Sequence, residues 1–277
     1  MSDRIINRIY LLIAVVTAVF ASSCSSDDAP DLSAGVAGNY EGYSSMTSGY
    51  FSNMISIDQK VTLTRLSDNT VSVSFASAST GTFTIPEATV VKSADSYTIS
   101  GTGTTSMGHA GSTKDYDCSF TGTINGDSRV FVFSIPSVMG GTTVTFTAGE
   151  LPESLYGYML AGSYSGIFNA KSAYFEMADD AESTVKVEAA ADGTVTIKCS
   201  SSTWGEISIP SVAVKRDGKT FSAQGTGVNN MAGMGGGATK EYACDGSISR
   251  NVDTEAVKVS FTMPAVMGGL TLSFDAD

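Results

Sequence analysis

The sequence predicts an all-β protein built from two tandem, small antiparallel up-and-down barrels of about eight strands each. Three observations lead to this fold class. The chain is rich in turn-forming glycine, with 29 Gly in 277 residues, and only 16% of its residues are charged. Apolar and polar residues alternate with a period of two in many segments. The same succession of motifs also occurs twice, roughly 125 residues apart.

Composition already excludes some classes of function. The formal net charge is -12 and the isoelectric point is about 4.4. A nucleic-acid-binding surface needs clustered basic side chains, so we expect no nucleic-acid partner. The chain has a single histidine, no nucleophile elbow and no pair of carboxylates placed around a scissile bond. We therefore expect no catalytic residues, no cofactor and no enzymatic activity.

Residues 1–23 read as a lipoprotein signal peptide. Arg4 and Arg8 provide a basic start, and residues 9–20 form an apolar run that is too short to cross a hydrocarbon core of about 30 Å. The following Ala-Ser-Ser-Cys resembles a bacterial lipobox, which predicts lipidation of Cys24. The alternative is an ordinary signal peptide with an accidental cysteine nearby.

Residues 24–37 read as a flexible tether, because Cys24 is followed by the polar and acidic run Ser-Ser-Asp-Asp-Ala-Pro-Asp. This run resembles the surface-export signal of Bacteroidetes lipoproteins. The resemblance implies an outer membrane lipoprotein that faces the cell surface and is attached to the membrane by its N-terminal lipid anchor. A plain linker on the periplasmic face is the alternative.

The rest of the chain consists of two copies of one unit, residues 38–149 and 162–277, joined by a linker at 150–161. The paired motifs are Gly-Asn-Tyr-Glu-Gly and Gly-Ser-Tyr-Ser-Gly, Thr-Ile-Pro and Ser-Ile-Pro, two Gly-Thr-Gly segments, Lys-Asp-Tyr-Asp-Cys and Lys-Glu-Tyr-Ala-Cys, and two Val-Met-Gly-Gly segments. A tandem duplication explains this order.

Alternation assigns the strands and their inward faces. The clearest inward sets are Val71, Val73 and Phe75, their counterparts Val195, Ile197 and Cys199, and the later series Val257, Val259, Phe261 and Met263. Asn-Gly and Asp-Gly pairs between such segments are typical of hairpin turns. A closed barrel removes exposed strand edges, and a sandwich is the competing architecture.

Each copy opens with Gly-x-Tyr, at Gly38 and Gly162, which looks like the Gly-x-Trp opening of a lipocalin-like barrel with tyrosine in place of tryptophan. This opening and the Ile-Pro and Val-Met-Gly-Gly motifs together resemble the calycin-like domain that occurs, often in tandem, in Bacteroidetes lipoproteins. The resemblance covers nearly all of residues 38–277. It implies a small barrel per repeat and brings no catalytic residues.

Candidate ligand contacts are Met107, His109 and Trp204. The first two lie in a Gly-rich stretch, which lacks the Lys-Ser/Thr and the following helix of a phosphate-binding loop. A barrel-mouth or hairpin loop is the simpler interpretation, and too few ligands are repeated to predict a metal site. Trp204 is the single tryptophan, and it either stacks on a sugar or packs within the protein.

Cysteines Cys118 and Cys244 occupy equivalent places in the two repeats, and both are predicted to face inward. Cys199 and Cys244 share the second repeat, so a Cys199–Cys244 disulfide is an alternative to free buried thiols. No Cys-x-x-Cys spacing occurs, which argues against a structural zinc site.

Two hypotheses for function remain. In the first, the lipid-anchored barrels form a non-catalytic binding module for a small apolar ligand, a glycan or a surface partner. In the second, the protein is a structural or accessory surface protein whose barrels are filled by their own side chains. The presence or absence of an interior cavity separates the two hypotheses.

Overall fold

The alternating segments form sixteen β-strands in a computed structural model, which describes residues 31–109, 112–233 and 237–276. The predicted signal peptide and residues 24–30 of the predicted tether, Cys24 among them, lie outside these residues. The first repeat contains β1 (Gly38–Thr47), β2 (Met54–Ser67), β3 (Thr70–Ser77), β4 (Gly81–Ser93), β5 (Ser96–His109), β6 (Ser112–Asn125), β7 (Ser128–Ile135) and β8 (Thr142–Ala148).

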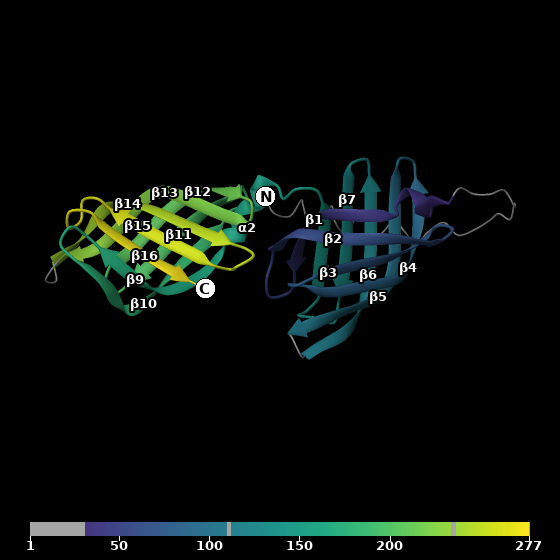
Figure 1. Cartoon of the computed structure of the whole chain (residues 1–277), viewed down its shortest axis with the longest axis horizontal. Coiled ribbons are helices and arrows are strands. Elements are labelled where there is room, and N and C mark those ends of the chain that lie inside the picture. Colours follow the sequence, from purple (N-terminus) through teal and green to yellow (C-terminus); the bar gives the residue numbers. More distant parts are fainter. Residues whose placement is uncertain (1–30, 110–111, 234–236, 277) are drawn as a thin grey trace. The chain divides into compact units, whose positions relative to one another are not determined.

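The second repeat contains β9 (Gly162–Lys171), β10 (Glu176–Ala189), β11 (Thr194–Ser201), β12 (Gly205–Asp217), β13 (Thr220–Gly233), β14 (Gly237–Asn251), β15 (Val257–Met263) and β16 (Leu270–Ala276). In each repeat the strands pair in sequence order, and the last pairs with the first (Figure 1). The prediction of two closed, antiparallel, eight-stranded barrels is therefore confirmed, and the sandwich alternative is wrong.

The inward faces predicted from alternation are buried. Val71, Val73 and Phe75 are at most 1% exposed, and Val257, Val259, Phe261 and Met263 are at most 2% exposed. Each barrel encloses its own cluster of apolar side chains. Among the described residues, no helix is long and apolar enough to cross a membrane.

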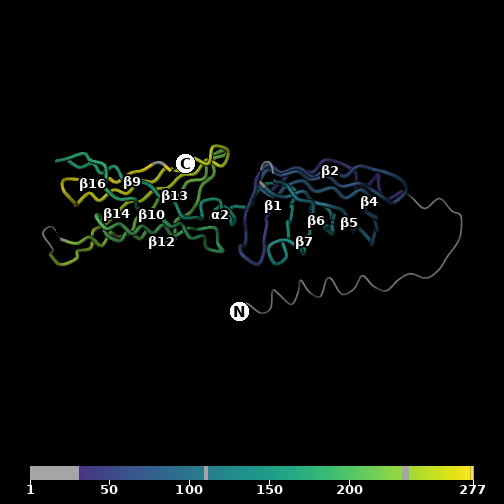
Figure 2. The backbone as a smooth tube through the Cα atoms, turned by 90° about the horizontal axis from the view of Figure 1, so that it is seen from below, coloured from purple at the N-terminus to yellow at the C-terminus, as the bar shows by residue number. Residues whose placement is uncertain are grey.

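A short helical turn precedes the first strand of each barrel. It is η1 (Leu32–Gly35) before β1, and η2 (Glu153–Leu155) followed by α2 (Tyr156–Leu160) before β9. Figure 2 shows α2 at one end of the strands of the second barrel. Val36, Met159 and Leu160 enter the cores from these segments and are at most 5% exposed.

The Ile-Pro motifs mark irregular points in β4 and β12. The β4–β5 ladder is interrupted between Thr84 and Glu87, and the β12–β13 ladder between Ser208 and Val214. Proline has no N–H to donate to a ladder, so Pro86 and Pro210 fit positions where pairing lapses.

Glycine on the neighbouring strand lets the backbones cross closely at these points. A Cβ on Gly103 would lie 2.1 Å from the carbonyl oxygen of Thr84, and one on Gly227 would lie 2.0 Å from that of Ser208. The second glycine of each Gly-Thr-Gly motif is thus explained by packing, because a side chain at Gly103 or Gly227 would overlap backbone.

Candidate functional site

The interior of the first barrel is filled by aromatic rings. Phe133 lies 4.8 Å from Phe83, 5.1 Å from Phe120 and 5.6 Å from Phe75, measured between ring centroids. Phe146 joins the cluster 5.7 Å from Phe131. These six rings are at most 1% exposed. At such spacings the rings are in contact, so they occupy the space in which a lipocalin-like barrel would hold an apolar guest.

The second barrel is filled with a different set of side chains. Phe168 lies 5.0 Å from Phe274 and 6.1 Å from Phe261. Cys199 stands where the first barrel has Phe75, while Trp204 stands where it has Thr80. Bulk lost at one position of the duplicated scaffold is therefore replaced at another, which keeps the interior packed.

The Gly-x-Tyr tyrosines pack against the barrel cores and bond to the segment before each first strand. Tyr40 donates its hydroxyl hydrogen to the carbonyl oxygen of Val36 at 2.6 Å, and Tyr164 donates to that of Leu160 at 2.8 Å. Burial raises the pKa of both phenols, and a nearby arginine, Arg129 or Arg250, partly offsets that rise.

Sequence reasoning missed these two arginines because they do not align. Arg129 lies on β7 opposite Ile124, whereas Arg250 takes the place of Ile124 and lies opposite Val257. Each barrel thus has one arginine and one aliphatic residue at the same cross-strand pair, with the two strands exchanged. The signal that could have found them is the combination of repeat alignment and hairpin register.

The predicted ligand residues are not brought together into one site. Met107 is half-buried and packs against the core of the first barrel. His109 is the last residue of β5, its backbone pairs with Ser112, and its side chain lies outside the described part of the chain. Trp204 belongs to the other barrel.

Trp204 packs inside the second barrel and does not present a face to solvent. Its side chain is 5% exposed and stacks on Phe175, with ring centroids 6.4 Å apart and planes 15° from parallel. Of the two interpretations left open by the sequence, packing is the one that this geometry favours.

The cysteines Cys118, Cys199 and Cys244 are all buried and free in the structure. Burial raises the pKa of Cys199 to about 12 and that of Cys244 to about 11, and it also raises the pKa of Cys118. Such thiols stay protonated near neutral pH and behave as small apolar side chains. No group of three or more His, Cys, Asp or Glu side chains among the described residues could hold a metal ion.

A cleft with both polar and apolar walls is present outside the barrel interiors. It has a volume of about 840 Å³, and its walls include Tyr43 and Gln59 from the first repeat, Tyr156 from α2 and Arg216 from the second repeat. Residues Leu32–Asp277, which contain both barrels, form one compact unit. Sequence analysis did not single out any of these residues, because their proximity depends on tertiary contacts between the repeats.

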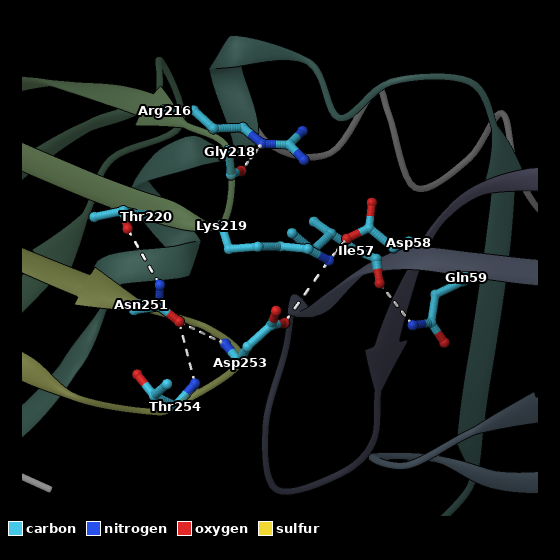
Figure 3. Close-up of polar contacts among 10 residues, drawn as sticks. All are labelled: Ile57, Asp58, Gln59, Arg216, Gly218, Lys219, Thr220, Asn251, Asp253 and Thr254. Carbon is cyan, nitrogen blue, oxygen red and sulfur yellow. Dashed lines mark hydrogen bonds and ion pairs between the residues drawn. The ribbon is translucent and has the colours of Figure 1, made fainter.

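A bulge in β2 makes those contacts. The β1–β2 register shifts beside Ile57 and Asp58, and Asp58 adopts a positive φ of 54°. Ile57 is 9% exposed and belongs to the apolar cluster of the second barrel. Asp58 forms an ion pair with Lys219, which also lies 3.7 Å from a carboxylate oxygen of Asp253 (Figure 3).

The contact residues differ between the repeats. The places of Ile57 and Asp58 are taken by Ala181 and Glu182 in the second copy, and that of Lys219 by Asp95 in the first. These side chains therefore belong to the junction, and the duplicated scaffold does not require them.

Comparison with known families decides the family of the chain. The model of the calycin-like β-barrel domain matches twice, at residues 36–148 and 160–277. The chain belongs to the calycin-like β-barrel domain family. No curated protein matches this calycin-like chain.

Two solved structures are similar to this calycin-like protein. The first is described as a "putative outer membrane protein" of Bacteroides fragilis. It is 22% identical, the alignment covers 90% of this chain and 100% of the other, and the TM-score is 0.59. The second, a protein of unknown function from Nostoc punctiforme, is 11% identical over 89% of this chain and 97% of the other, with a TM-score of 0.25. The first supports the calycin-like fold over both repeats.

Proposed function

We propose that this calycin-like protein is a non-catalytic, lipid-anchored outer membrane lipoprotein that binds its partner outside its two filled barrels. The observation that carries the proposal is the cluster of six phenylalanine rings in the first barrel, which are at most 1% exposed and in mutual contact. An apolar ligand would have to displace these rings, and each buried phenylalanine stabilises the fold by about 3–5 kcal/mol relative to alanine.

The lipid anchor and its location rest on the sequence. Cys24 follows a short apolar run and precedes an acidic tether, and this order is typical of lipoproteins sorted to the cell envelope. The solved structure from Bacteroides fragilis described above carries a compatible description. Cys24→Ala should shift the protein from the membrane fraction to the soluble fraction. Proteinase K added to intact cells should degrade the wild-type protein if it faces outward, and spare it if it faces the periplasm.

The filled barrels are tested by analysing the full chain extracted from its membrane in detergent. Native mass spectrometry, followed by chloroform extraction and lipid analysis of the same sample, should find no apolar molecule other than the covalent anchor. A stoichiometric apolar molecule released only on denaturation would overturn the proposal and favour an interior ligand carrier.

A further inference from the structure

The cleft beside the Asp58–Lys219 contact has the side chains of a ligand site. Its volume of about 840 Å³ lies in the range of about 300–1,000 Å³ that is usual for small-molecule sites, which often occur where domains meet. Side chains fill both barrel interiors, whereas this cleft lies outside them. We propose that the cleft binds a short oligosaccharide, with Arg216 as its principal polar contact.

The lining combines polar and apolar surface in nearly equal amounts, as suits a sugar with its hydroxyl groups and its apolar ring faces. The aliphatic side chains among the lining residues are Ile57 and Leu151, which are 9% and 4% exposed. Tyr43 and Tyr156 are half-buried and line the same space. Tyrosine offers both an apolar ring face and a hydroxyl, as a sugar requires of its binding site.

Two polar groups in the lining have unused hydrogen-bonding capacity. Gln59 donates from its amide nitrogen to the carbonyl oxygen of Ile57 at 2.7 Å, while its amide oxygen is buried and has no hydrogen-bond partner in the part of the chain that the structure describes. Arg216 donates from Nε to the carbonyl oxygen of Gly218 at 2.9 Å, and its two terminal nitrogens point away from that contact (Figure 3). Over the described residues, Arg216 forms no ion pair.

The guanidinium of Arg216 is also held in place before any ligand arrives. The Nε–Gly218 hydrogen bond fixes one edge, and the group lies over the ring of Phe221 at 5.7 Å. A planar, pre-positioned donor pair can bind two neighbouring hydroxyl oxygens, or the two oxygens of a carboxylate, at a low entropic cost. Neutral sugars and uronic acids share this chemistry.

A peptide partner fits the walls less well. Peptides often bind by adding a strand to a free sheet edge, and the two barrels are closed, with every strand paired on both sides. The lining carries carboxylates such as Glu41 and Glu150 beside Lys60 and Arg216. This mixture of charges does not select an acidic or a basic peptide, whereas a sugar can bond with both kinds of group.

The first barrel provides a matched control for Arg216. Lys92 occupies the equivalent place in the first repeat, and its ammonium lies over Tyr97 at 5.4 Å, as Arg216 lies over Phe221. Lys92 does not line the cleft. Lys92→Ala and Arg216→Ala therefore remove comparable cation–aromatic contacts, and only the second changes the cleft.

The test uses the full chain in detergent and three probes: maltohexaose, chitotetraose and tetragalacturonate. Calorimetry should detect binding of at least one probe. Arg216→Ala should weaken that binding about tenfold or more, while Lys92→Ala should change it by less than about twofold. Binding of tetragalacturonate alone would identify an acidic sugar, and binding of maltohexaose or chitotetraose a neutral one. Failure of all three probes to bind, or equal affinity of Arg216→Ala and wild type, would overturn the proposal.

Hydrogen exchange supplies a second readout that does not depend on a variant. A bound sugar should slow amide exchange in residues 149–156 and 216–219. Protection confined to other segments would place the sugar elsewhere and refute the cleft site. This inference rests on the proposed function in one respect, namely that the partner binds outside the barrels. An apolar guest inside a barrel would overturn the proposed function and leave the cleft result unchanged.

Discussion

The hydroxyl of Tyr40 donates a hydrogen bond to the carbonyl oxygen of Val36, four residues earlier in the chain. Tyr164 and Leu160 repeat this bond in the second barrel. In both cases the phenol ties the turn that precedes the barrel to the first strand. Val36 and Leu160 are fully buried, so the two carbonyl groups depend on this donor.

Removing this hydrogen bond gives the first prediction. Tyr40→Phe keeps the ring and leaves the Val36 carbonyl without its donor, so the free energy of unfolding should fall by about 1–3 kcal/mol. Tyr164→Phe should have a similar effect on the second barrel. Urea denaturation followed by circular dichroism measures both. Tyr50→Phe is the control, because the Tyr50 side chain is 82% exposed. A loss equal to that of Tyr50→Phe would contradict the prediction.

The close crossing of β4 and β5 gives the second prediction. Gly103→Ala would place a methyl group 2.1 Å from the carbonyl oxygen of Thr84, so backbone must shift, and destabilisation by about 1–3 kcal/mol or more is expected. Gly38→Ala is the matched control, since a Cβ there meets nothing within 4 Å. Thermal unfolding of both variants checks the prediction, which fails if they melt together.

The third prediction concerns the filled interior. Phe133→Ala removes the ring that contacts Phe75, Phe83 and Phe120, and it should cost about 3–5 kcal/mol while opening a dry, apolar cavity. An apolar cavity of this kind can bind benzene. Benzene should therefore raise the melting temperature of Phe133→Ala and leave that of wild type unchanged. A comparable rise in wild type would show that the native barrel already has room for a guest.

The fourth prediction follows from the buried thiols of the second barrel. With pKa values of about 12 and 11, Cys199 and Cys244 are roughly a thousandth thiolate or less at pH 8. Iodoacetamide should modify them only after denaturation, and the denatured chain should show the mass of free thiols. Rapid labelling of the native protein, or a mass two hydrogens lower, would contradict free, protonated thiols.

These thiols also predict how stability depends on pH. Unfolded cysteine loses its proton near pH 8.5, whereas the folded thiols keep theirs to about pH 11 or 12. The unfolded state therefore binds fewer protons within this window, and the free energy of unfolding should fall as pH rises through it. The double substitution of Cys199→Ala with Cys244→Ala should reduce this dependence of the free energy of unfolding on pH. Urea denaturation between pH 8 and pH 11 measures it.

Much of the fold was predictable because it depends on local pattern. The duplication follows from the repeated motifs, and the inward face of Val71, Val73 and Phe75 follows from period-two alternation. The turns at Gly126 and Gly193 follow from Asn-Gly and Asp-Gly pairs, in which glycine tolerates a positive φ. Family membership followed from motifs that recur in order. These signals can be recognised in the sequence because each depends on a few adjacent residues.

The candidate site was not predictable for the opposite reason. The cleft depends on Ile57 and Asp58, which a bulge in β2 presents to another repeat, and on Arg216 from β12. No sequence period marks a bulge that serves a tertiary contact. The environment of Trp204 was not predictable either. Its inward packing is evident only from its tertiary contact with the ring of Phe175.

The exchange of arginine between Arg129 and Arg250 has a consequence for reading duplicated proteins. When two strands lie side by side in fixed register, selection can act on the pair of positions as one unit, and a charge can move to the neighbouring strand while staying on the same rung. A column-by-column comparison of the two repeats would score two unrelated changes at these positions. A comparison by ladder rungs would score only the exchange of isoleucine for valine. Searches for distant copies of this barrel would gain sensitivity by treating each rung as a single character.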